Sequence, residues 1–541
     1  MVISSSGDTS EQFDGEAKPS SSRTVKAADL RGRGQGRHPI VGSRFTDRGV
    51  AIRIFLTCWL LFTLHFATNT AREIYPALSL GDHLNFNVTE YGGLHPDIFE
   101  IPGRGSFINN NPGASIIGSI PYALLRPITD RIVERVQAAR SADSQPARAD
   151  YDTIYPMAQE FLQKARERGF DVKFGLAAGI MQAFAMAPIS ALGVVAMFWI
   201  LRSLTGTRRA SIMLSLLYAF ATPIFYRTAQ LNQNVLLANF ALFAFVLLWC
   251  PSGHAGGDRL RPFYFLAGVC TGWTVVLDYS GLVAVAALGG YALARWYAGP
   301  ADDRKLSDLG KFAFGIALCA AVLMAYQWTS FGNPILPPQS YMPAANYTDL
   351  GYRGFSLPQF DLLFQTAFGI QYGLFTSAPI LLTAFLVPLW LKRSNRLLEN
   401  RELIFVLSLT ALFFTFCAAN QYGRMQFNSG VRHIVPVVPF VFLLVSNVLI
   451  RLPAIVTALI GVIGTYWSWC LVMYRDVEQG FGVFESIKHI TLEGFRLPWL
   501  TTLERMGFVN TSSAIPLLLL SGVIIWLIWN IGAKAKNVEF S

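Results

Sequence analysis

The sequence predicts an all-α integral membrane protein, a polytopic helical bundle of about twelve transmembrane helices with a large first extracytoplasmic loop. Composition is the first observation: 52% of the residues are hydrophobic and only 14% are charged, whereas soluble domains carry roughly 25% charged residues. The second is that apolar runs recur along the chain, each long enough to cross a hydrocarbon core that needs about 20 helical residues. The third is that Lys and Arg gather in the connectors between these runs, where positive charge sets orientation.

The two ends of the chain lack apolar character. Residues 1–50 are rich in Ser, Gly and Arg, and such a composition cannot bury enough apolar surface to fold. We therefore expect a disordered, basic cytoplasmic tail there, a transmembrane domain over 51–533 and a short cytoplasmic tail over 534–541. Because the first apolar run begins only near Ile52, a cleaved signal peptide is not expected.

The apolar runs predict the membrane spans in chain order. Between them lie either short basic connectors or longer segments of mixed character. The expected spans are 52–70, 174–202, 210–227, 232–250, 263–278, 280–297, 311–330, 374–391, 403–420, 434–450, 454–473 and 512–531.

Basic residues indicate which face of this bundle is cytoplasmic. A dense run of Lys and Arg precedes the first span, and further basic clusters follow in alternate connectors. The positive-inside rule assigns those connectors and both termini to the cytoplasm. The outer face then carries four loops, over 72–173, 331–373, 421–433 and 474–511. Long loops of this kind are usually functional, so we expect chemistry at the extracytoplasmic surface.

Several classes of function have no support in the sequence. The net charge of +10 is spread over connectors, so no compact basic domain exists to bind nucleic acid. The six cysteines lie in apolar runs without metal or disulfide spacing. No P-loop, dinucleotide fingerprint or HExxH element occurs. No nucleotide or redox cofactor is therefore expected. A divalent metal is left open, and any sugar donor is expected to be membrane-borne.

The first outer loop holds the candidate catalytic acids. Glu73 follows closely on the first span, at the level where a membrane-anchored substrate presents its polar head, and can act there as a general base toward an acceptor hydroxyl. Asp97, in the HPD element ahead of a Gly-Arg-Gly turn, is its main rival, and Asp82 is the third candidate. The alternative is that these residues, with Glu90 and Glu100, form a solvated charged surface.

The end of that loop has the pattern of an anion site. Asn110 and Asn111 precede Pro112, which suits the first turn of a helix, and Asn111 can cap that helix through its side-chain oxygen. The free N–H groups of the helix can then hold a phosphate, with Arg104 as a further candidate contact. The apolar segment that follows is only about a dozen residues long, too short to span. We expect a helix in the interface or re-entering the bilayer, or else an amphipathic packing helix.

A second cationic site is predicted near the start of the span at 434–450. Arg424, Arg432 and His433 precede it, and arginine makes bidentate contacts with phosphate oxygens at any pH. They can hold a lipid phosphate leaving group, or simply contact ordinary headgroups. Asp278 falls between two spans, and a carboxylate inside the bilayer costs at least about 2.5 kcal/mol. It is therefore expected at the outer interface or in a polar cavity, where it positions an arginine or a substrate hydroxyl or is merely solvated.

Four stretches, in order, resemble elements of one family. GRGSFINNNPGASIIGSIPYAL, FGNPILPPQSY, QYGLFTSAPILL and NSGVRHIVPVVPF are similar to elements of the GT-C membrane glycosyltransferases, in particular the bacterial dolichyl-phosphate-mannose protein mannosyltransferase-like group. The resemblance spans most of residues 72–440. It implies a catalytic acid in the first outer loop, a polyprenyl-phosphate sugar donor and inverting transfer. Family members commonly carry an acidic pair after the first span, where this chain has Arg72 and Glu73.

The resemblance implies a mannosyltransferase-like enzyme of the bacterial inner membrane, active on the periplasmic side. Its expected partners are a polyprenyl-phosphate sugar, membrane lipids and a protein, lipid or glycan acceptor. A polytopic transporter or flippase of lipid-linked or small solutes is the alternative from another class, although it rarely needs a first outer loop of about a hundred residues. A catalytically lapsed scaffold for envelope assembly is a third reading.

Overall fold

The computed structural model describes residues 46–68, 71–142, 156–250, 262–301, 304–343, 350–390, 397–424, 431–478, 480–505, 509–511 and 513–531. The described residues from Asp47 onward form one compact unit. Nearly all of the expected N-terminal tail and the whole of the expected C-terminal tail lie outside the described residues, so both stay predictions.

Apolar helices account for each of the expected spans. Their ends agree with the sequence expectation to within a few residues in most cases, and two expected spans are each divided between two helices by a break in the chain. They are α1 (Asp47–Leu64), α5 (Asp171–Met181) continued by the π-helical η3 (Gln182–Met186) and α6 (Ala187–Thr205), α7 (Arg208–Phe220), α8 (Pro223–Arg227), α9 (Gln233–Trp249), α10 (Tyr264–Leu277), α11 (Gly281–Ala298), α12 (Leu306–Phe331), α14 (Leu374–Ser377), η6 (Pro379–Trp390), α15 (Asn400–Ala419), η9 (Val435–Val437), α16 (Val438–Leu449), α17 (Ala454–Met473) and α20 (Ile515–Asn530).

Length limits how many of these helices qualify as spans on their own. Four in the described part are long and apolar enough to cross a membrane: Asp171–Thr205, Leu306–Phe331, Asn400–Ala419 and Ala454–Met473. Five further apolar helices are shorter, among them α9, α10 and α20. The expected helical membrane architecture is thus supported, whereas the count of about twelve spans stays a prediction.

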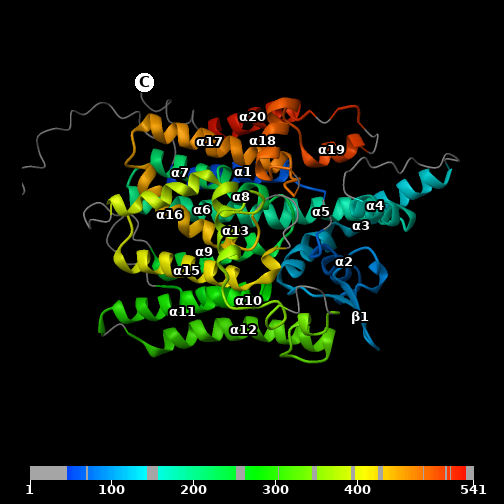
Figure 1. Cartoon of the computed structure of the whole chain (residues 1–541), viewed down its shortest axis with the longest axis horizontal. Coiled ribbons are helices and arrows are strands. Elements are labelled where there is room, and N and C mark those ends of the chain that lie inside the picture. Colours follow the sequence, from blue (N-terminus) through cyan, green and yellow to red (C-terminus); the bar gives the residue numbers. More distant parts are fainter. Residues whose placement is uncertain are drawn as a thin grey trace, which may run out of the picture. The chain divides into compact units, whose positions relative to one another are not determined.

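The expected outer loops carry their own short elements. The first contains α2 (Ile74–His83), η2 (Thr89–Tyr91), the strands β1 (Ile98–Ile101) and β2 (Gly105–Ile108), α3 (Gly113–Ala142) and α4 (Pro156–Glu167). The others contain η5 (Pro338–Ser340), α13 (Phe360–Phe368), η8 (Gln421–Arg424), α18 (Val483–Glu493) and α19 (Pro498–Arg505). Figure 1 shows α2, β1, α3 and α4 gathered at one end of the long apolar helices.

The two strands form an antiparallel hairpin that packs on α12. Phe99 lies opposite Phe107 in the register, and both rings pack against Phe331 at the end of α12. This aromatic contact fixes the segment between α1 and α5 on the bundle, because buried aromatic pairs contribute about 0.5–1.5 kcal/mol beyond their area.

Helix α3 differs from the expectation for its segment. Its apolar start is the expected dozen residues, but the helix continues to Ala142, 30 residues in all. The continuation after Pro127 is rich in charged residues with apolar residues at helical spacing, which sustains an amphipathic helix. Whether its start lies in the membrane interface stays a prediction.

Small residues allow α10 and α12 to approach closely. A Cβ on Gly268 would lie 2.1 Å from the carbonyl oxygen of Phe312, and one on Gly315 would lie 2.6 Å from the carbonyl oxygen of Phe265. Such backbone contact is typical of helix pairs in membranes, where small residues mediate packing. The pair holds the C-terminus of α10, which carries Asp278, in a fixed place.

Candidate active site

A cavity of about 1660 Å³ lies where the loops expected to be extracytoplasmic meet the ends of the apolar helices. Successive helices supply its lining alternately with a carboxyl end and an amino end: Arg227 ends α8, Asn232 precedes α9, Asp278 follows α10 and Ser280 precedes α11. This alternation is the pattern expected of a chain that crosses a layer back and forth. It gathers residues that are far apart in the sequence at one end of the bundle.

The lining is strongly cationic. Among the described residues it includes eight arginines and five aspartates or glutamates, and no lysine. Arginine stays charged when partly buried and offers a planar fork of donors that matches phosphate and carboxylate groups. The lining therefore offers guanidinium donors of the kind that anions accept.

Arg72 lies between two of the candidate catalytic acids. Its Nη1 is 3.4 Å from Oδ2 of Asp97 and its Nε is 3.5 Å from Oε1 of Glu73. Nη1 also donates to the side-chain oxygen of Asn109, at 3.3 Å. The two carboxylates are not equivalent, because 28% of the Asp97 side chain is exposed but only 3% of the Glu73 side chain. Asp97 is the one that a ligand can reach.

The amide of Gln233, at the start of α9, completes this arrangement. With its nitrogen toward the first loop, the amide donates to Oε1 of Glu73 and accepts from Nη2 of Arg72 at 2.8 Å. In the opposite orientation the nitrogen faces Oδ2 of Asp278 at 3.4 Å. The side chain of Gln233 thus lies between Arg72, Glu73 and Asp278 in either case.

The carboxylates keep Arg72 charged. Burial disfavours its guanidinium, but Glu73, Asp97 and Asp278 outweigh burial, and the pKa of Arg72 is raised above its ordinary value. Asp278 itself is oriented by the backbone N–H of Ser280, which donates to Oδ1 at 2.8 Å. The expectation that Asp278 lies in a polar cavity agrees with this geometry.

A group of buried arginines faces the acids. Arg227 and Arg475 are 2% and 7% exposed, and Arg227 lies within the electrostatic reach of both Arg475 and Arg432. Nη2 of Arg475 donates to Oε1 of Gln230 at 3.2 Å. Burial lowers the pKa of Arg475 to about 10, and burial and Arg72 lower that of Arg432. An anion among these arginines would relieve their mutual repulsion.

Two histidines of the lining are neutral at pH 7. Burial lowers the pKa of His433 well below its ordinary value, and Arg432, Arg72 and Arg227 lower it further. Burial also lowers the pKa of His95. Because Nδ1 of His95 accepts from the backbone N–H of Asp97 at 3.0 Å, its proton resides on Nε2, where the ring is a hydrogen-bond donor.

Asp82, the third candidate acid, is engaged elsewhere. Its carboxylate lies 2.6 Å from Nζ of Lys173 and 3.2 Å from Nε of Arg126, and it accepts a hydrogen bond from the hydroxyl of Tyr122 at 3.1 Å. These contacts tie α2 to α3 and α5 rather than serving the cavity. Asp82 therefore forms structural ion pairs with Lys173 and Arg126.

Arg424 is likewise neutralised outside the cavity lining. Its Nη2 lies 2.6 Å from Oδ2 of Asp361 in α13 and 3.1 Å from Oε1 of Gln359. Its neighbour Tyr422 does line the cavity. Arg424 therefore lies outside the cavity lining. Arg432 and His433 belong to that lining, as do the candidate acids Glu73 and Asp97.

Three residues of the predicted anion site lie outside the cavity lining and hold the loop together: Asn110, Asn111 and Arg104. Nδ2 of Asn111 donates to the backbone oxygen of Val275 at 2.6 Å, and its Oδ1 has no partner among the described residues, so the expected helix cap is not formed. The backbone oxygen of Asn110 accepts from the Tyr326 hydroxyl at 3.1 Å. Arg104 contacts the backbone oxygen of Thr329 near the end of α12 at 3.5 Å.

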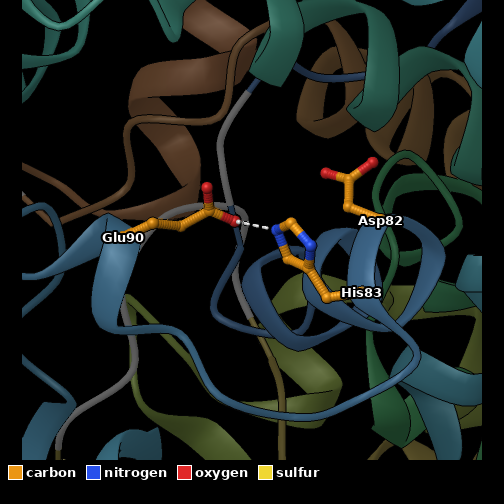
Figure 2. A group of neighbouring side chains, drawn as sticks. All are labelled: Asp82, His83 and Glu90. Carbon is orange, nitrogen blue, oxygen red and sulfur yellow. Dashed lines mark ion pairs between the residues drawn. The ribbon is translucent and has the colours of Figure 1, made fainter.

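One group in the described part has metal-ligand composition. Asp82, His83 and Glu90 bring one possible ligand atom each within 4.8 Å of one another, and Figure 2 shows Glu90 paired with His83 at 3.4 Å. Because Lys173 and Arg126 already neutralise Asp82, the group does not need a cation to balance its charge. All six cysteines are free, in agreement with the sequence expectation.

Comparison with known proteins adds little evidence about the function of this site. The chain matches no protein-family profile, and no curated protein matches it. Among solved structures, the crystal structure of ArnT from Cupriavidus metallidurans bound to undecaprenyl phosphate is similar at 13% identity and a TM-score of 0.45, covering 90% of this chain and 74% of that chain. A likeness of this size does not establish a shared function.

Sequence patterns left several residues of the site unidentified. Arg227, Arg475, Arg72, His95 and Gln233 all line the cavity or contact its acids. Arg227 and Arg475 each stand at the end of an apolar run, where arginine ordinarily reads as an anchor to headgroups. Their position on the same side as the outer loops, opposite the basic connectors, was the available signal.

Proposed function

We propose that the chain is an integral-membrane glycosyltransferase of the GT-C type. It transfers a sugar from a polyprenyl-phosphate donor to an extracytoplasmic acceptor, which is a protein hydroxyl, a lipid or a cell-envelope glycan. The observation that carries the proposal is the cavity at the end of the apolar helices, where an acid reachable by ligand faces a group of buried arginines.

The arginines suit the donor. A polyprenyl phosphate keeps its chain among apolar helices and presents its phosphate at their ends, where Arg227, Arg432 and Arg475 lie. Phosphate oxygens accept bidentate hydrogen bonds from guanidinium groups, and the charge that develops on the leaving phosphate is stabilised by the same contacts. A neutral His433 beside them adds a hydrogen-bonding group without further positive charge.

The acids suit the acceptor. In a single displacement, the acceptor oxygen bonds to the anomeric carbon while the bond from that carbon to the phosphate oxygen breaks, and the phosphate leaves with the electron pair. The hydroxyl proton passes to Asp97, and Arg72 orients the carboxylate for this step. Glu73 is buried and keeps Arg72 in place. One displacement inverts the configuration at the anomeric carbon.

The remaining assignments follow from the sequence. Mannosyltransferase-like specificity and the bacterial plasma membrane rest on the family resemblance. The basic connectors favour cytoplasmic termini and a cavity on the periplasmic side. No nucleotide or redox cofactor takes part in the proposed step.

Reconstitution tests the proposal against its alternatives. The purified protein is placed in proteoliposomes with a polyprenyl-phosphate sugar labelled in the sugar, together with solubilised cell-envelope acceptors. Label in a new glycoside supports the proposal. Label that crosses the bilayer without forming a glycoside indicates a transporter or flippase, and label that does neither indicates a scaffold.

A further inference from the structure

Arg353 lies on a strained turn at the edge of the cavity. The backbone N–H of Tyr352 donates to the oxygen of Phe355 at 2.7 Å, and that of Phe355 donates back to Tyr352 at 3.0 Å. The two residues between them, Arg353 and Gly354, have φ of +50° and +84°. This is the two-residue hairpin turn with positive φ at both central positions, which ordinarily takes Asn-Gly or Asp-Gly.

Arginine is a poor choice for that backbone. Residues with a Cβ pay a steric penalty at positive φ, and Asn, Asp or Gly avoid most of it. Strained positions persist only where the surroundings enforce them, and they concentrate at ligand clamps and active sites. We therefore expect the side chain of Arg353 to have a functional role that offsets the strain of its backbone.

The end of α15 and the start of η8 hold the turn in place. The backbone N–H of Gln421 donates to the oxygen of Gly354 at 2.9 Å, and that of Ser356 donates to Ala419 at 2.9 Å. Nε2 of Gln421 also donates to Oγ of Ser356 at 2.8 Å. The turn is thus held on the end of α15 from both sides.

The charge of Arg353 is directed to the cavity without a carboxylate partner in the described part of the chain. Its side chain is exposed and lines the cavity, and its Nη1 donates to the backbone oxygen of Gln339 at 3.0 Å. By contrast, Arg140 and Arg424 are paired with Asp171 and Asp361. The guanidinium of Arg353 keeps donors available for a ligand.

A short chain of contacts joins Arg353 to the acids. Nε2 of Gln339 donates to the backbone oxygen of Asn109 at 3.0 Å, and the side-chain oxygen of Asn109 accepts from Arg72 at 3.3 Å. Arg72 in turn contacts Asp97. These contacts connect Arg353 with the acids, beside which the acceptor hydroxyl is proposed to bind.

We propose that Arg353 binds an anionic group, a phosphate or a carboxylate, on the acceptor substrate. This rests on the proposed function and adds the class of acceptor, an anionic molecule rather than a neutral glycan or an uncharged protein segment. The side chain of Tyr352, 81% exposed and also in the lining, offers an aromatic face beside the charge.

The backbone conformation supplies the test. Arg353→Asn and Arg353→Gly place residues that favour positive φ in the turn, so the melting temperature is expected to stay unchanged or to rise. Cell-envelope acceptors are separated by ion exchange into anionic and neutral fractions and offered to the reconstituted enzyme. The wild type is expected to prefer the anionic fraction, and both variants are expected to lower that preference at least tenfold through KM. Arg353→Lys, which keeps the charge, is expected to restore part of it.

A second strained position is the matched control. Leu84 also has a positive φ, +54°, and lies outside the cavity lining, 86% exposed. Leu84→Asn is expected to raise the melting temperature and to leave the preference among acceptors unchanged. An equal preference in the wild type and in Arg353→Asn would overturn the proposal for Arg353.

An activity-independent measurement separates this proposal from the proposed function. If neither fraction accepts sugar, the proposed function fails. Labelling of arginines by phenylglyoxal then tests separately whether Arg353 binds an anion. Inorganic phosphate, and separately the anionic fraction, are expected to protect Arg353 in peptide mass spectra but not Arg104, which is exposed and outside the lining. Protection by phosphate but not by the anionic fraction indicates a site for free phosphate and overturns the assignment to the acceptor. Equal labelling of Arg353 and Arg104 in the presence of either ligand overturns the anion site itself.

Discussion

Nη1 of Arg72 lies 3.4 Å from Oδ2 of Asp97, 25 residues further along the chain. The same guanidinium contacts Glu73, the other leading candidate for the catalytic acid. The two residues that the sequence offers as alternative catalytic acids therefore contact the same arginine in the structure. Arg72 contacts both carboxylates. Asp97 is exposed to the cavity and is the proposed base, whereas Glu73 is buried and keeps Arg72 in place.

Arg432 and Arg424 are expected to behave differently although the sequence treats them alike. Arg432→Ala is expected to raise the Kd for a polyprenyl phosphate about 10- to 100-fold, because a hydrogen bond to a charged group contributes about 1.5–3 kcal/mol. Arg424→Ala is expected to leave Kd unchanged, since Asp361 and Gln359 engage Arg424. Binding of the lipid in nanodiscs measures both, and equal effects would remove Arg432 from the donor site.

Asp82→Asn is expected to weaken the fold rather than the chemistry. Only 4% of the Asp82 side chain is exposed, and the change leaves Lys173 without its counter-charge and Arg126 with Asp130 alone. Breaking a buried ion pair costs about 3–5 kcal/mol, and the exposure of Arg126 places this case at about 3 kcal/mol or less. Thermal unfolding checks the loss. An unchanged melting temperature with abolished transfer would restore Asp82 as a catalytic candidate.

His433 is expected to make the fold acid-sensitive. Its pKa in the folded protein is lowered well below the ordinary 6.5, so above about pH 6.5 both folded and unfolded states are neutral and stability is fully present. As pH falls below 6.5, the unfolded state binds a proton that the folded state does not, and stability declines by at most about 1.4 kcal/mol per pH unit. His433→Gln should reduce the slope of melting temperature against pH between 5 and 7.

A second histidine of the cavity lining contributes to the same slope. His95 contributes with the same sign as His433, because burial lowers its pKa as well, so the His433 variant retains part of the slope. An identical slope in wild type and His433→Gln would contradict the assignment.

Gly268→Ala is expected to push α10 away from α12. The added Cβ would lie 2.1 Å from the backbone oxygen of Phe312, and a backbone atom cannot rotate aside. Overpacking of this kind costs about 1–3 kcal/mol, and the shift would also displace Asp278 at the end of α10. Gly289→Ala in α11 meets nothing within 4 Å and should be neutral or stabilising. Melting temperatures of the two variants make the comparison.

The sequence was a good guide to local features of this chain and a poor one to distant contacts. The apolar runs became helices, and Glu73, Asp97, Asp278, Arg432 and His433 all line one cavity, as expected of residues that end or follow spans on one face. Hydrophobic periodicity and position relative to a span are local properties. They are legible without knowing which helices are neighbours.

Contacts with partners that are distant along the chain cannot be read from local sequence. Arg424 and Asp82 look like site residues until Asp361 and Lys173, 63 and 91 positions away, are seen to neutralise them. Asn111 looks like a helix cap, but its amide instead satisfies a carbonyl at the end of α10, one of the groups that every helix leaves unpaired. Arg227 and Arg475 end apolar runs, as headgroup anchors do, and only their predicted position opposite the basic connectors distinguishes them.

The most direct measurement is the rate of sugar transfer from a polyprenyl-phosphate donor by the reconstituted wild type and by Asp97→Asn, with donor binding measured in parallel. A general base contributes about 10²- to 10⁴-fold. The account predicts that Asp97→Asn lowers kcat at least 100-fold while it binds the donor normally, and that Glu73→Gln lowers kcat less. Transfer by Asp97→Asn at the wild-type rate would contradict the account.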